Sequence, residues 1–137
     1  MKKVEYADQM HNSKYNCCQA VACAYAEEVG MSKQDLFRMA EGFGFGFGCM
    51  EGICGALSGA VILAGVVNSD GNLEAPGTKK DTYKLSKEMV RLFQEKTGGL
   101  ICRDLKGIDT GVVLCTCPNC IKAGVEVAQE VLGLPAE

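Results

Sequence analysis

The longest apolar run in the chain, residues 53–67, constrains the fold more than any other feature of the sequence. The run contains no charged residue, and it is shorter than the roughly 20 residues that a helix needs to cross a bilayer. A helix that is apolar on every face is stable when other elements surround it. The run therefore predicts a helix at the centre of a helical bundle.

Most of the remaining chain has the spacing of apolar residues that is typical of amphipathic helices. Helices are predicted over residues 12–29, 32–40 and 82–96, and a last helix is predicted to start at Pro118, a residue favoured in the first helical turn. No internal repeat or second zone of composition interrupts this pattern. We therefore predict one all-α domain over residues 1–137, a compact bundle of about five helices around the apolar central helix.

Glycine and phenylalanine alternate over residues 42–48. The alternation has the period of a strand, but glycine is depleted from strands. We expect instead a glycine-rich loop whose phenylalanines pack into the core or form part of a homodimer interface.

The charge of the chain excludes some classes of partner. The net charge is −3, and no basic run is longer than two residues, which argues against nucleic acid or an anionic membrane. Residues 4–8, which follow the first lysines, lack the apolar stretch of a signal peptide. We therefore expect a cytoplasmic protein, in a compartment where thiols are kept reduced.

Cysteine is unusually frequent, with nine residues in a chain of 137. An odd number cannot all pair within one chain, and a domain of this size folds without disulfides. Cys54 and Cys120 fall in the opening turns of predicted helices, and Cys17 does so if Asn16 is the cap. Helix N-termini carry partial positive charge, which favours the thiolate that binds metals and attacks disulfides.

Four segments resemble the C_GCAxxG_C_C family, a group of small bacterial and archaeal proteins described as redox-active. These segments are residues 16–21 (NCCQAV), 54–60 (CGALSGA), 102–107 (CRDLKG) and Cys120. The resemblance covers about residues 12–133 and implies a signature set of Cys17, Cys54, Cys102 and Cys120. A related module occurs in redox proteins that carry an iron–sulfur centre beside haems. This chain has no Cys-x-x-Cys-His motif, which excludes covalently attached haem.

The first functional hypothesis is electron transfer by an iron–sulfur cluster. The signature cysteines Cys17, Cys54, Cys102 and Cys120 would be its ligands, because four thiolates are the usual ligand set of such clusters. A protein of this kind would exchange electrons with a redox partner protein. No hydrolytic or group-transfer constellation is visible, and whether the protein is an enzyme is left open.

Three alternatives stand beside this hypothesis. Thiol–disulfide exchange would use Cys117 with Cys120, or Cys17 with Cys54. A structural zinc site needs pairs of ligands two to four residues apart, and the 115–120 segment offers the one such cluster. The third alternative is that the cysteines are buried residues without redox or metal chemistry, since free cysteine packs as a small apolar side chain.

The cysteines outside the signature are expected to have smaller roles. Three of them are predicted to pack as small apolar residues: Cys18, Cys23 and Cys49. Cys115 and Cys117 lie in the 115–120 segment (CTCPNC), in which Cys117 and Cys120 form a Cys-x-x-Cys unit. The strand that precedes this unit in thioredoxin-like proteins is missing. The single histidine, His11, is far from every motif and is expected at the surface.

Overall fold

The computed structural model describes residues 1–137 and contains eight α-helices and no strand. The helices are α1 (Lys3–Asn12), α2 (Cys17–Ala24), α3 (Ala26–Val29), α4 (Lys33–Ala40), α5 (Gly55–Asn68), α6 (Lys79–Thr97), α7 (Cys102–Leu105) and α8 (Cys117–Leu132). A 3₁₀ turn, η1 (Glu41–Phe43), and a π turn, η2 (Gly46–Met50), lie between α4 and α5. The all-α prediction is confirmed. No helix has both the length and the hydropathy needed to span a membrane.

The chain has more helices than predicted, and the differences lie in its N-terminal part. Helix α1 was not predicted; it packs against α2 and α8 through its buried residues Ala7 and Met10. The predicted helix over 12–29 begins instead at Cys17 and is interrupted at Tyr25, which separates α2 from α3. The Tyr25 ring is fully buried and its hydroxyl donates a hydrogen bond to the Pro135 carbonyl at 2.8 Å. This contact ties the break to the C-terminal segment.

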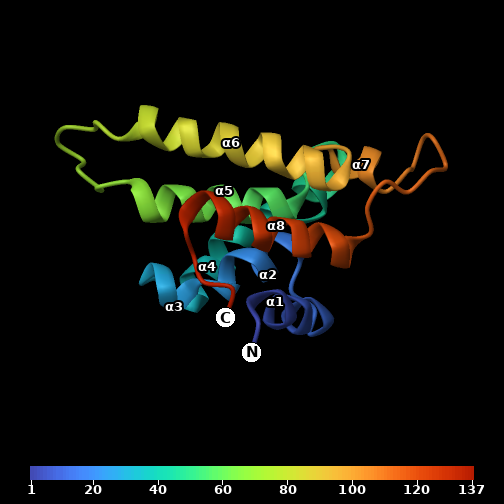
Figure 1. Ribbon diagram of the computed structural model, residues 1–137, viewed down its shortest axis with the longest axis horizontal. Helices are drawn as coiled ribbons and strands as arrows, with labels where there is room; N and C mark the ends of the chain where they lie inside the picture. Colours follow the sequence, from blue (N-terminus) through green and yellow to red (C-terminus); the bar gives the residue numbers. More distant parts are fainter.

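Helix α5 packs against α2, α6 and α8, as Figure 1 shows. Small residues allow the close approach of these helices. A Cβ added to Gly59 of α5 would lie 2.8 Å from the Cys18 carbonyl oxygen of α2, and one added to Gly124 of α8 would lie 2.7 Å from the Ala56 carbonyl oxygen of α5. The first half of α5 is buried, whereas Val67 near its end is exposed.

The glycine–phenylalanine stretch does not anchor in the core, so that part of the prediction is wrong. The side chains of Phe43, Phe45 and Phe47 are 37%, 56% and 53% exposed. Two of the glycines face inward instead: a Cβ on Gly44 would meet the Asn16 side chain at 2.3 Å, and one on Gly46 would meet Cys102 Cβ at 2.6 Å. Because the backbone itself makes the close contact, the phenylalanine rings point outward.

Two long connections extend from opposite ends of the bundle (Figure 1). Residues 69–78 join α5 to α6, and residues 106–116 join α7 to α8. The two termini lie next to each other, and the Lys3 amide donates a hydrogen bond to the Ala136 carbonyl at 2.8 Å. The 106–116 connection begins and ends beside the cavity described next.

Candidate functional site

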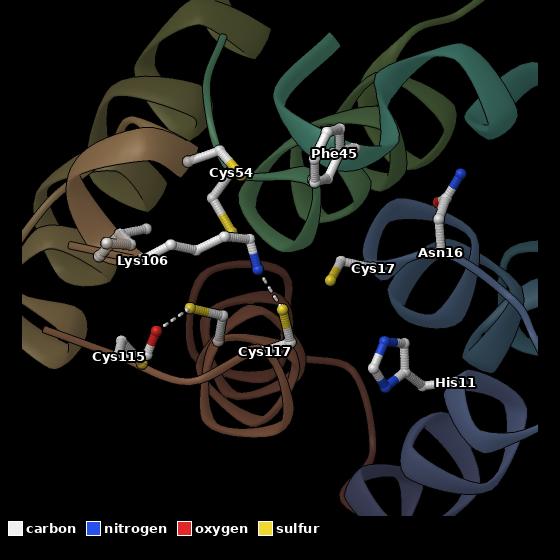
Figure 2. A pocket seen from close by; sticks show the side chains of 12 residues that line it. His11, Asn16, Cys17, Phe45, Cys54, Lys106, Cys115 and Cys117 are labelled. Carbon is white, nitrogen blue, oxygen red and sulfur yellow. Dashed lines mark hydrogen bonds between the residues drawn. The ribbon is translucent and has the colours of Figure 1, made fainter. Parts of the chain in front are cut away.

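Six of the nine cysteines line one cavity of about 160 Å³ (Figure 2). They are Cys17, Cys54, Cys102, Cys115, Cys117 and Cys120. The cavity lies where α2, α5, α7 and α8 begin. The structure thus brings all four signature cysteines together, although they are far apart in the sequence.

The position of Cys17 is fixed by the cap of α2. Asn16 is the N-cap: its side chain accepts a hydrogen bond from the Gln19 amide, and the Gln19 side chain accepts one from the Asn16 amide, both at 2.9 Å. The Asn16 side chain also donates to the Glu41 carbonyl at 2.9 Å. These contacts hold Cys17 as the first residue of the helix, with its sulfur toward the cavity.

Cys54 and Cys102 are brought together by a short antiparallel bridge between their segments. The Cys54 amide donates to the Leu100 carbonyl at 2.8 Å, and the Cys102 amide donates to the Gly52 carbonyl at 3.0 Å. Cys54 is the N-cap of α5 and not a residue of its first turn, whereas Cys102 is the first residue of α7. Both side chains are buried at the cavity wall.

The first turn of α8 supplies the remaining wall of the cavity. Cys117 is the first residue of this helix and Cys120 lies one turn later on the same face. The Cys120 sulfur lies 3.7 Å from the carbonyl oxygen of Cys115, which precedes the helix. The weak Cys-x-x-Cys signal of the sequence therefore falls in the same cavity as the signature cysteines.

Cys17 and Cys117 affect each other's ionisation in the cavity. Interaction with the Cys17 thiol, together with the ammonium group of Lys106, lowers the pKa of Cys117 to about 5. Interaction with Cys117, together with burial, raises the pKa of Cys17 above its ordinary value. These shifts favour the thiolate of Cys117 and the neutral thiol of Cys17.

Cys54 and Cys120 affect each other's ionisation in the same way. Interaction with Cys120 lowers the pKa of Cys54 to about 7, helped by the backbone N–H groups of Ala56 and Leu57 at the start of α5. The pKa of Cys120 is raised by its interaction with Cys54 and by burial. The members of both exchange pairs considered from the sequence, Cys117 with Cys120 and Cys17 with Cys54, line this one cavity.

Two basic side chains, Lys106 and His11, share the cavity with the thiols. The Lys106 ammonium donates a hydrogen bond to the Cys117 sulfur and forms no ion pair with a carboxylate (Figure 2). His11 projects from α1 and lines the cavity. The expectation that His11 lies far from every motif was therefore wrong. No sequence signal marked it, because α1 itself was not predicted. No carboxylate lines the cavity.

The remaining cysteines lie outside the cavity. Cys18 and Cys23 are 0% and 1% exposed and pack in the core, as predicted. Cys49 is exposed, so its predicted burial was wrong. It lies in the η2 turn, where backbone in the left-handed region directs the chain outward.

The nine cysteines are all free, with no disulfide formed. No three or more side chains of histidine, cysteine, aspartate and glutamate are arranged to hold one metal ion.

A family model described as "Putative redox-active protein (C_GCAxxG_C_C)" matches residues 15–131. No match was found among curated proteins or among solved structures. The matched region contains all six cysteines of the cavity and Lys106. By this match over most of its length, the chain belongs to the C_GCAxxG_C_C family.

Proposed function

We propose that this protein transfers electrons by means of an iron–sulfur cluster held in the six-cysteine cavity. Cys17, Cys54, Cys102 and Cys120 are the proposed ligands. The observation that carries the proposal is that these four thiols, each from a different element, line one cavity. Thiolates are the protein ligands that iron–sulfur clusters use most often.

The chemistry of the cavity suits such a group. Its sulfur donors are soft ligands, and no carboxylate competes with them. Cavity cysteines lie at the starts of α2, α5 and α8. The partial positive charge and the free backbone N–H groups at a helix start favour thiolates and hydrogen bonds to sulfur. When bound, the cluster supplies a reversible electron acceptor whose potential such contacts adjust. Lys106 adds a positive charge against the negative charge of the thiolates.

A redox partner protein would approach the cavity from the side of the exposed phenylalanines. Phe45 lines the cavity and is more than half exposed. The exposed rings of Phe43 and Phe47, two residues away on either side in the sequence, form an edge-to-face contact with each other. Apolar rings at the rim of a redox site provide contact area for another protein. A second copy of this chain is the other partner that we consider for this surface.

Anaerobic reconstitution with ferrous iron and sulfide tests the proposal. The protein should take up iron together with acid-labile sulfide and acquire visible absorption and, after reduction, an EPR signal. A Cys17→Ser/Cys54→Ser variant should lose this uptake, while Cys49→Ser, at an exposed position outside the cavity, should keep it. Absence of bound iron and sulfide in the wild-type protein would rule the proposal out, and zinc found by elemental analysis would identify a structural metal site instead.

A second candidate function, thiol–disulfide exchange, is favoured by the contact between Cys117 and Lys106. The Cys117 thiolate would form a bond to one sulfur of a substrate disulfide and release the other sulfur as a thiolate. Cys17 or Cys120 would then attack the Cys117 sulfur and release the second substrate thiolate, so that two electrons pass from the pair to the substrate.

Metal-free protein distinguishes this second function from the first. A reversible two-electron thiol titration in the absence of iron, lost in Cys117→Ser and kept in Cys49→Ser, would support exchange. A titration that is unchanged in Cys117→Ser would count against it.

A further inference from the structure

Apart from the thiols, the ionisable groups that line the cavity are all basic. They are Lys106, which follows α7, and His11 of α1. Neither side chain is paired with a carboxylate. The carboxylates of Glu51 and Asp109 are paired instead with Arg103, at 3.5 and 2.8 Å. A ligand that enters the cavity therefore meets cationic and N–H groups and no acidic side chain.

The Lys106 ammonium lies at the sulfur that the exchange function would use. It donates one hydrogen bond to the Cys117 sulfur (Figure 2). An ammonium group has three N–H donors, so two remain for an acceptor on a ligand beside that sulfur. The imidazole of His11 lines the same cavity, and it keeps at least one N–H donor whether it is neutral or charged.

The cavity has room for a small group only. Its volume is about 160 Å³, whereas pockets for drug-sized ligands span roughly 300–1,000 Å³. Beside the thiols, its uncharged wall consists of Phe45, Gly55, Leu105 and Asn16, and the Asn16 amide group is already bonded to backbone atoms. One half of a low-molecular-weight disulfide suits such a space, and Lys106 selects the charge of that half.

We propose that the substrates of this cavity are low-molecular-weight disulfides that carry carboxylate groups. The proposal rests on thiol–disulfide exchange, the second candidate function argued above. The Cys117 sulfur forms a bond to one substrate sulfur, the substrate S–S bond breaks, and the other sulfur leaves with the electron pair as a thiolate. The carboxylate of the half that stays on Cys117 accepts a hydrogen bond from the Lys106 ammonium, which repels a cationic substrate.

Three small disulfides of different charge test this substrate class: dithiodipropionate is anionic, hydroxyethyl disulfide is neutral and cystamine is cationic. Acid quenching and mass spectrometry measure how fast each one oxidises the reduced, metal-free protein, in a Cys49→Ser background that lacks the exposed thiol. Each rate is divided by the rate of the same disulfide with 2-mercaptoethanol, which removes differences in intrinsic reactivity.

Replacement of Lys106 by methionine should change the order of these rates. We expect the anionic-to-cationic ratio to fall by at least about fivefold in Lys106→Met, the factor expected for one unit charge at about 4 Å in water. Any change in the reactivity of Cys117 itself affects all three disulfides alike and cancels in the ratio. Lys106→Arg, which keeps the charge, and Lys96→Met, which removes a surface lysine, should retain the wild-type ratio.

The outcomes separate the substrate class from the exchange function. An equal ratio in the wild type and Lys106→Met, or faster oxidation by a protein disulfide such as that of insulin than by dithiodipropionate, would overturn the substrate class and leave exchange intact. Oxidation by none of the disulfides, or at rates unchanged in Cys117→Ser, would overturn exchange at Cys117, and the substrate class with it.

Discussion

At the scale of single residues, the most unusual contact is that of Lys106 with the sulfur of Cys117. The ammonium group is partly buried and has no carboxylate partner, so the thiolate is its counter-charge. Lys106 lies four residues after the signature cysteine Cys102 in the sequence. Nothing in the sequence indicated that Lys106 contacts Cys117, because the 106–116 connection separates the two residues along the chain. The interaction with Cys17 and this contact together make Cys117 the most acidic thiol of the cavity.

Replacement of Lys106 by methionine should make Cys117 less acidic in the reduced, metal-free protein. The wild-type thiol should react with iodoacetamide with a midpoint near its pKa of about 5. In Lys106→Met the midpoint should rise, because the positive charge beside the Cys117 sulfur is removed. Peptide mapping by mass spectrometry assigns the reaction to Cys117. Lys96→Met, which removes a surface lysine paired with Glu130, should leave the midpoint unchanged, and an unchanged midpoint in Lys106→Met would contradict the contact.

At the scale of elements, the approach of α2 and α5 sets the position of two cysteines. Gly59 allows the α5 backbone to lie against the Cys18 carbonyl of α2. Because Cys17 opens α2 and Cys54 caps α5, the same approach brings their ends together at the cavity. Gly59, a small residue of the family signature, thus allows the close packing of α2 and α5.

Gly59→Ala should destabilise the protein by about 1–3 kcal/mol, because the added Cβ would lie 2.8 Å from the Cys18 carbonyl oxygen and 2.9 Å from Val21 Cβ. Gly65→Ala is the matched control in the same helix, where an added Cβ has no neighbour within 4 Å. That variant should be stabilised by up to about 1 kcal/mol, since alanine favours the helix. Urea denaturation measures both free energies of unfolding, and equal effects of the two substitutions would disprove close packing at Gly59.

At the scale of the whole molecule, buried thiols link stability to pH. Burial raises the pKa of Cys18 to about 12 and also raises that of Cys23, whereas an unfolded chain ionises both near 9.0. Above that pH the folded protein binds more protons than the unfolded chain, so the free energy of unfolding falls as pH rises.

Cys23→Ala should make this decline less steep, by up to about 1.4 kcal/mol per pH unit between pH 9 and the raised pKa. The comparison uses the slope, so the packing lost with the sulfur does not affect it. Cys49→Ala removes an exposed thiol and should keep the wild-type slope. Denaturation of the reduced, metal-free protein at several pH values provides the measurement. Parallel slopes in Cys23→Ala and the wild type would show that Cys23 ionises alike in both states.

The sequence predicted the parts of the fold that depend on local pattern. Apolar periodicity predicted the all-α class, and a cap residue located the start of α4, where the Ser32 hydroxyl accepts from the Asp35 amide. The start of α2 was placed at residue 12, and only the structure shows that Asn16 is its cap. The pattern failed for α1, whose buried residues Ala7 and Met10 form too weak a stripe. It failed again for the glycine–phenylalanine stretch, because period alone does not tell which side of a turn faces inward.

The sequence by itself determined that the chain is helical and which four cysteines form the family signature. Only the tertiary structure decided that Cys115, Cys117, Lys106 and His11 share their cavity. The physical reason is that helix propensity and capping act over a few residues, whereas the cavity forms from helix ends that packing alone brings together. Sequence motifs therefore identified the cysteines, and the packing of α2, α5 and α8 brought them to one cavity.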